Sequence, residues 1–146
     1  MTNGRNNITP EDLAKLHEPA AAGVLVYCES TGEFLLMKRN PKAKAYPATW
    51  SVPSGESHVN QLESMDECAK REFNEETSVQ IPSDNNFWCI DRYPVDDRMY
   101  FVFIWKVKKK FFVKLDAEHT EAGWFMVDNL PDPISPQILD AIKRIA

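Results

Sequence analysis

Residues 71–76 read Arg71-Glu72-Phe73-Asn74-Glu75-Glu76, and they lie inside a longer run from Glu63 to Thr77. Apolar residues recur through this run at helical spacing, namely Met65, Cys68, Ala69 and Phe73. The spacing predicts an amphipathic helix over Glu63–Thr77 with one stripe facing a core. Because residues three and four apart share a face of a helix, Glu72, Glu75 and Glu76 are expected to converge on one side.

Upstream of this helix, the sequence predicts a hairpin and a short strand. Ala20–Cys28 is an apolar, β-branched run, and Phe34–Lys38 is a second run of strand type. Between them, Ser30-Thr31-Gly32 is typical of a turn. Trp50–Val52 is expected to be a short strand, and Thr9-Pro10 begins a predicted helical extension within residues 1–18.

Downstream, the sequence alternates between runs of strand type and turns until a final helix. One strand is predicted to begin over Val79–Ile81. Further strands are predicted over Phe87–Tyr93, Met99–Val107, Phe111–Leu115 and Trp124–Val127. Ser135-Pro136 opens the last helix, whose buried side is expected to carry Ile138, Leu139, Ile142 and Ile145. Strands on both sides of a central helix predict a single α/β domain over residues 1–146, with a mixed sheet flanked by helices on both faces.

The bulk properties argue against several classes of protein. The net charge of the 146 residues is −5 and no long basic stripe is present, so nucleic-acid binding and membrane binding are not expected. No apolar run is long enough to span a bilayer, and residues 1–7 lack the core of a signal peptide. The three cysteines and three histidines lack disulfide-frame or zinc-finger spacing, which favours a reducing, cytoplasmic location.

The three glutamates of the central helix have two interpretations. Magnesium prefers oxygen ligands, and a carboxylate patch beside the turn at Gly55 is a plausible place for it. The alternative is a solvated acidic face, in which Glu67 pairs with Arg71 and Asp66 pairs with Lys70 at four-residue spacing. Arg71 is also within reach of Glu75 in such a helix.

These residues resemble the signature of the Nudix hydrolases, a family that includes MutT-like pyrophosphohydrolases. The signature is a glycine, five residues, a glutamate, seven residues, and then Arg-Glu-apolar-x-Glu-Glu-x-Gly-apolar. The matching residues are Arg71, Glu72, Phe73, Glu75, Glu76 and Val79, with Glu63 seven residues before Arg71. Trp50–Gly55 upstream and Glu118–Glu121 with Trp124 downstream extend the resemblance over residues 20–131. It implies an α/β/α sandwich with a mixed, mainly antiparallel, curved sheet.

The chain departs from that signature in three places. The segment from Gly55 to Glu63 is two residues longer, and Gln61 occupies the position that glutamate would have without the insertion. Ser54 replaces a glycine common in the turn, and Ser78 replaces the glycine that ends the helix. The last position often needs a left-handed backbone, which costs serine about 1 kcal/mol more than glycine.

The resemblance implies Mg²⁺-dependent hydrolysis, with Mn²⁺ as an alternative ion, of a pyrophosphate bond in a nucleoside diphosphate derivative. ADP-ribose, a dinucleoside polyphosphate or a nucleoside triphosphate would release a nucleoside monophosphate. The implied metal ligands are the carbonyl of Gly55 and the carboxylates of Glu72, Glu75, Glu76 and Glu118. Glu72 or Glu118 would assist as base, and Arg71 would orient a glutamate. Glu121 is a second candidate for the base. His119 is a third, although a lone loop histidine is more often a surface residue, and that is the expectation here.

The substrate and the assembly are less strongly indicated. Arg39 and Arg92 are candidates to bind phosphate, and aromatic residues to stack on a base are Tyr46, Trp88, Tyr93 and Tyr100. A monomer or a homodimer is expected, with Met99–Trp105 as an exposed apolar strand for a dimer. Two other functions remain: a catalytically weak Nudix-fold module that binds a nucleotide or a protein, and a metal-buffering protein. Retention of all three glutamates favours the enzyme.

Overall fold

Strand β1 (Ala20–Cys28) lies at the centre of a seven-stranded mixed sheet with the order β3-β2-β1-β6-β5. The computed structural model describes residues 20–57, 63–83, 86–95 and 97–146, so the helical extension predicted within residues 1–18 lies outside them. β1 runs parallel to β6 (Arg98–Val107) along its whole length, from Ala20 opposite Met99 to Cys28 opposite Val107. β5 (Phe87–Val95) pairs with β6 in antiparallel fashion and forms one edge.

The other edge of β1 is shared by two strands, and this division creates the site. Residues Val26–Cys28 pair with β2 (Glu33–Arg39), whereas Ala21–Gly23 pair with β4 (Ser54–Glu56). β2 in turn pairs with β3 (Trp50–Ser51) and with β7 (His119–Phe125). The β3–β4 segment therefore fits into the space where β1 and β2 separate.

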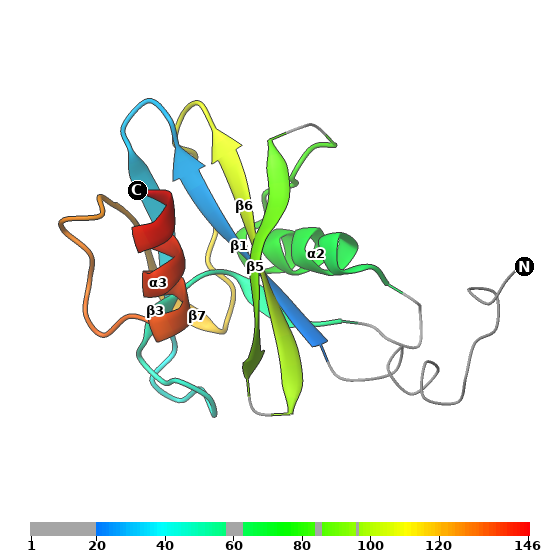
Figure 1. Cartoon of the computed structure of the whole chain (residues 1–146). Coiled ribbons are helices and arrows are strands. Elements are labelled where there is room, and N and C mark those ends of the chain that lie inside the picture. Colours follow the sequence, from blue (N-terminus) through cyan, green and yellow to red (C-terminus); the bar gives the residue numbers. More distant parts are fainter. Residues whose placement is uncertain (1–19, 58–62, 84–85, 96) are drawn as a thin grey trace, which may run out of the picture.

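Helices α2 (Met65–Thr77) and α3 (Pro136–Ile145) cover opposite faces of the sheet (Figure 1). The alternation of side chains along β1 supplies both cores, because successive residues point to opposite faces. Val24 and Val26 pack with Phe73 of α2, and Leu25 packs with Ile138 and Ile142 of α3. The predicted α/β/α sandwich is confirmed.

The ends of α2 follow from its sequence. Ser64 caps the first turn, where its hydroxyl accepts from Glu67 N–H and the Glu67 carboxylate accepts from Ser64 N–H. The helix therefore begins at Met65, two residues after the predicted start. It ends at Ser78, which has φ 64° and ψ 18° and occupies the left-handed region expected for the missing glycine.

Two predicted strands are wrong, and a third has different bounds. Residues 79–82 and 111–116 are irregular, although both segments carry strand-type residues. Phe111 and Val113 instead pack against the α2-side core, and Lys114 N–H donates to the carbonyl of Thr77 at 3.1 Å. β7 begins at His119 rather than Trp124, because it pairs with nearly the whole length of β2.

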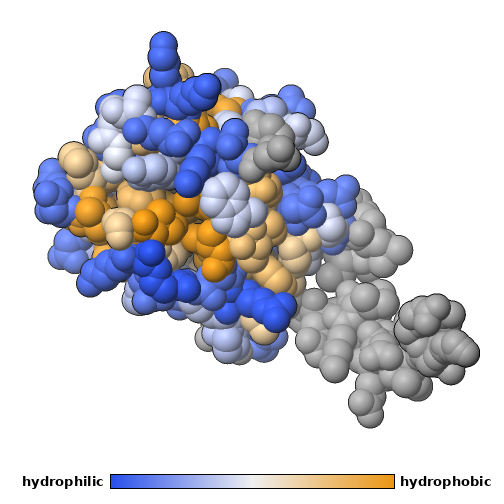
Figure 2. All heavy atoms as spheres, turned by 45° about the horizontal axis from the view of Figure 1, so that its top comes forward, coloured by the Kyte–Doolittle hydropathy of each residue, from blue (hydrophilic) through white to orange (hydrophobic). Residues whose placement is uncertain are grey.

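β6 is not an exposed strand available to a dimer, because it lies between β1 and β5 and its residues Val102–Trp105 are buried. Apolar side chains instead gather on the face shown in Figure 2, with hydrophilic residues around them. Patches of this kind are typical of contact surfaces. A monomer or homodimer stays a prediction. None of the described helices has the length and apolar character needed to cross a membrane.

Candidate metal and nucleotide site

The polar pocket beside α2, here called the carboxylate pocket, collects most of the predicted metal ligands. It is lined by Ala21, Arg39, Ser54, Gly55, Glu56, Glu72, Glu75, Arg98 and Glu118. Glu72 and Glu75 come from α2, Gly55 comes from β4, and Glu118 comes from the turn before β7. Segments more than sixty residues apart in the sequence thus meet where β4 lies beside α2.

Glu76 is the buried member of the set, since only 2% of its surface is exposed. Its Oε1 accepts from the backbone N–H of Ser54 at 3.2 Å, and its Oε2 has no hydrogen-bond partner among the described residues. Burial, followed by the close approach of Glu72 and the charges of Glu72, Asp116 and Glu118, raises the pKa of Glu76 to about 10. This carboxylate therefore needs either a proton or a cation, as expected of a metal ligand.

Gly55 allows the close approach of β4 to α2. A Cβ atom at position 55 would overlap the carboxylate of Glu72. The Gly55 carbonyl accepts from the thiol of Cys68, with Sγ and O 3.6 Å apart, so it points toward α2. Burial raises the pKa of that thiol to about 12, which keeps it protonated as a donor.

Arg71 ties the acidic residues together. Its Nε and Nη2 contact both oxygens of Glu63 at 2.6 and 3.0 Å, and its Nη1 contacts Glu72 at 2.8 Å and Glu75 at 3.1 Å. Nη2 also donates to the carbonyl of Glu56. These contacts raise the pKa of Arg71, with the Glu63 hydrogen bonds as the largest cause. Arg71 thus holds Glu72 and Glu75 in place, as a charged fork does.

The alternative pairing of the acidic helix is not observed. Glu67 belongs to the helix cap with Ser64 instead of pairing with Arg71. Lys70 lies over the ring of Phe87, with Nζ 4.9 Å from the ring centroid. Arg71 does reach Glu75 within the helix, as the four-residue spacing allows.

Two further pockets adjoin the carboxylate pocket through Arg39. One, the lysine pocket, is lined by Arg39, Asn40, Lys42, Ala43, Lys44, Ala45, Ala117 and Glu118. The other, the Tyr46 pocket, is lined by Arg39, Tyr46, Thr49, Ser51, Ser54, Val95, Tyr100, Ser135 and Gln137. The Arg39 Nε–H donates to the carbonyl of Ala45 at 2.9 Å, which fixes the guanidinium where the pockets meet.

Of the six residues predicted to bind substrate, the structure brings Arg39, Tyr46 and Tyr100 together at this place. Trp88 and Arg92 lie on β5, on the far side of β1 and β6 from β2. Lys106 Nζ lies 5.4 Å from the centroid of the Trp88 ring, and Arg92 lines a groove with Met65 and Phe103. Tyr93 donates to the carbonyl of Gln137 instead of facing the carboxylate pocket.

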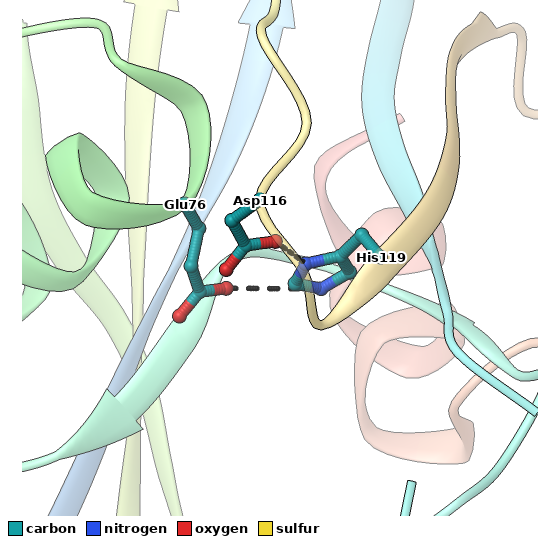
Figure 3. Close-up of side chains that lie close together, drawn as sticks. All are labelled: Glu76, Asp116 and His119. Carbon is teal, nitrogen blue, oxygen red and sulfur yellow. Dashed lines mark hydrogen bonds and ion pairs between the residues drawn. The ribbon is translucent and has the colours of Figure 1, made fainter. Parts of the chain in front are cut away.

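The prediction that His119 is a surface residue is wrong, because only 6% of it is exposed. Its Nδ1 lies 2.8 Å from Asp116 Oδ1, and its Nε2 lies 3.7 Å from Glu76 Oε1. Figure 3 shows the three side chains facing one another, with Glu76 from α2, Asp116 from the segment before β7 and His119 from the first residue of β7. Glu121, two residues beyond His119, is exposed and lies 3.6 Å from Lys38.

Sequence reasoning missed Asp116. It indicated the loops over residues 40–49 and Pro94–Arg98 as borders of the pocket, but it did not single out Arg98, Lys42 or Lys44. The signal for Asp116 was its spacing from His119, since a turn over Asp116–His119 places both side chains on one side, and His119 N–H donates to Asp116 O at 3.5 Å. Arg98, at the start of β6, pairs with Glu56 across the carboxylate pocket. Lys42 and Lys44 had no distinguishing pattern in the sequence.

Comparisons with known proteins agree with this geometry. The model of the NUDIX domain family matches residues 17–145. The NAD-capped RNA hydrolases NudC of Stutzerimonas stutzeri (strain A1501) and Vibrio vulnificus (strain CMCP6) are 27% and 26% identical over 115 and 145 residues. The matches cover 79% and 91% of this chain but only 40% and 51% of those proteins.

Solved structures resemble the chain in fold. A MutT NUDIX hydrolase from Burkholderia pseudomallei has a TM-score of 0.68 at 19% identity, covering 87% of this chain and 97% of that one. The NUDIX domain of Shewanella oneidensis NrtR, complexed with ADP ribose, has a TM-score of 0.69 at 14% identity, covering 99% and 97%. The family model, the relatives and the fold agree, and the chain belongs to the NUDIX domain family.

Proposed function

We propose that the chain hydrolyses the pyrophosphate bond of a nucleoside diphosphate derivative with Mg²⁺ held in the carboxylate pocket. The observation that carries the proposal is the buried carboxylate of Glu76, whose Oε2 has no hydrogen-bond partner among the described residues. A buried charge of this kind needs a counter-ion, and Mg²⁺ is a hard cation that prefers oxygen.

The residues present fit such an ion. Oxygen donors are offered by Glu72, Glu75 and Glu118 on the pocket wall, by the carbonyl of Gly55, and by the buried Glu76, which lies close to Glu72 and Ser54. When bound, Mg²⁺ would neutralise pyrophosphate charge, polarise phosphorus and lower the pKa of the attacking water. Family membership supports a divalent ion, and the all-oxygen donor set supports Mg²⁺.

The chain's own groups have separate tasks in this proposal. Arg71 holds Glu72 and Glu75 in position through the contacts at 2.8 and 3.1 Å. Glu118 borders both the carboxylate pocket and the lysine pocket, so its exposed carboxylate can accept the proton of the attacking water. The proton leaves the water as its oxygen bonds to phosphorus and the bridging P–O bond breaks.

Cationic groups around the pocket suit a diphosphate. Arg39 borders all three pockets, Arg98 lies in the carboxylate pocket, and Lys42 and Lys44 line the lysine pocket. The nucleoside would extend into the Tyr46 pocket, where the Tyr46 ring is 52% exposed and free to stack on a base. Trp88 and Arg92 would contact only a substrate long enough to reach β5.

The test is a product assay with Mg²⁺ on ADP-ribose, NAD, NAD-capped RNA, a dinucleoside polyphosphate and nucleoside triphosphates. We expect nucleoside monophosphate from at least one substrate, and Glu76→Gln should reduce kcat by about 100-fold or more because a metal ligand is lost. Glu29→Gln is the matched control. Glu29 is exposed in the turn that follows β1, so this variant should keep full turnover. Nucleotide binding without turnover would instead establish the catalytically weak binding module.

A further inference from the structure

The carboxylate of Glu76 faces a nitrogen donor, the Nε2 atom of His119. His119 Nε2 lies 3.7 Å from Glu76 Oε1, and the two side chains are each only 2% exposed. That separation is too long for a hydrogen bond. Two atoms that each lie about 2.1 Å from one ion are separated by roughly 3.0–3.6 Å for angles between octahedral and trigonal geometry. The gap therefore matches two ligands of one cation more closely than a direct contact.

Asp116 sets the orientation of the histidine ring. Its Oδ1 lies 2.8 Å from His119 Nδ1, so Nδ1–H donates to the carboxylate when the imidazole is neutral. The lone pair then resides on Nε2, the nitrogen that faces Glu76. A carboxylate that holds the far nitrogen of a histidine is the usual support of a metal-binding imidazole, because it fixes the tautomer and raises the basicity of the ligand.

We propose that Glu76 and His119 Nε2 hold a divalent first-row transition-metal ion, with Asp116 as the positioning residue for the histidine. This site deepens the proposed function, because Glu76 would be shared with the oxygen-donor site of the carboxylate pocket. A carboxylate can bridge two ions in two-metal hydrolytic sites. A second observation is that the other oxygen of this carboxylate, Oε2, is buried with no hydrogen-bond partner among the described residues, so the protein leaves donor capacity of Glu76 unused.

The donor set decides which class of ion fits. Imidazole nitrogen is a ligand for transition metals, whereas Mg²⁺ takes oxygen almost exclusively. The mixed carboxylate and imidazole set therefore separates this position from the all-oxygen carboxylate pocket. Glu76, Asp116 and His119 each offer one donor atom, and these atoms lie within 4.8 Å of one another.

Electron spin echo spectroscopy of the full chain with substoichiometric Mn²⁺ tests the proposal directly. A histidine ligand gives ¹⁴N modulation of the echo, and we expect that modulation in the unsubstituted chain. His119→Gln should abolish it and should raise the Mn²⁺ Kd by about 10- to 100-fold, while the Mg²⁺ Kd changes much less. Asp116→Ala should raise the Mn²⁺ Kd by a similar factor, and Asp116→Asn should restore part of it.

The control is the double variant His17→Gln with His58→Gln, which removes the other two histidines of the chain. It should keep the ¹⁴N modulation. Absence of modulation in the unsubstituted chain, or its persistence in His119→Gln, overturns the site. The measurement is independent of turnover. Modulation by ¹⁴N in a chain that hydrolyses no substrate would contradict only the proposed function. Mg²⁺-dependent hydrolysis without modulation would contradict only this inference.

Discussion

The backbone of Gly55 lies against the carboxylate of Glu72 so closely that no side chain fits between them. The contact joins β4 to α2 and places a carbonyl oxygen beside a carboxylate, two oxygen donors of the proposed Mg²⁺ site. Gly55 has no positive φ, so its role comes from space rather than from backbone conformation.

Replacing Gly55 with alanine should displace Glu72 from this position. We expect the Mg²⁺ Kd to rise by about tenfold or more, and overpacking to lower the free energy of unfolding by about 1–3 kcal/mol. Isothermal titration calorimetry with Mg²⁺ measures the first effect. Gly32→Ala is the control. Alanine would be strained at the φ of 75° that Gly32 adopts, but position 32 lies in a turn away from the pocket. Equal Mg²⁺ affinity in both variants would contradict the assignment.

Arg71→Lys should separate charge from geometry. A lysine ammonium cannot match the paired contacts to Glu63 while also reaching Glu72 and Glu75, so these carboxylates lose their fixed positions. We expect kcat/KM to fall by about 10- to 100-fold. The comparison is Arg144→Lys, which affects exposed pairs with Asp140 and Asp91. A loss confined to thermal stability would show that Arg71 is purely structural.

The raised pKa of Glu76 sets the direction in which the free energy of unfolding of the metal-free chain changes with pH. Its folded-state pKa of about 10 lies above the ordinary value of 4.5. Between these two pH values the folded chain keeps a proton that the unfolded chain releases. The free energy of unfolding is therefore highest below pH 4.5 and decreases as the pH rises toward 10. The slope is at most about 1.4 kcal/mol per pH unit.

Urea unfolding in the presence of a chelator, at several pH values within that window, measures this loss. Glu76→Gln removes the titrating group, so its unfolding free energy should depend less on pH. Addition of Mg²⁺ should reverse the trend in the unsubstituted chain, because the cation binds the ionised carboxylate. Parallel pH profiles for the two chains without metal would refute the raised pKa.

Ser78→Gly should stabilise the chain. Serine at φ 64° is strained where glycine is not, and the Ser78 backbone N–H still donates to Asn74 O at 2.9 Å. The expected gain in the free energy of unfolding is about 0.5–1 kcal/mol, measured by urea unfolding. Ser83→Gly, at a residue whose φ is not positive, should give no gain. Equal gains would mean that the left-handed conformation of Ser78 carries no cost.

Local sequence patterns predict much of the fold and one wall of the site. The strands β1, β2, β5 and β6 and the final helix follow from apolar runs and turn residues. The helical period alone predicts that Glu72, Glu75 and Glu76 lie on one face, without any tertiary contact. These features depend on interactions between residues a few positions apart, which the sequence displays directly.

Only the tertiary structure decided where the rest of the chain meets that face. Residues 111–116 have a strand-type sequence but pair with none of the described strands, and Phe111 and Val113 pack against the α2-side core instead. His119 is buried under Glu76 because β7 pairs with β2, and Trp88 is directed elsewhere because β5 is the far strand. A strand needs a partner and a ligand set needs several segments, and both depend on long-range pairing that no local pattern of residues contains.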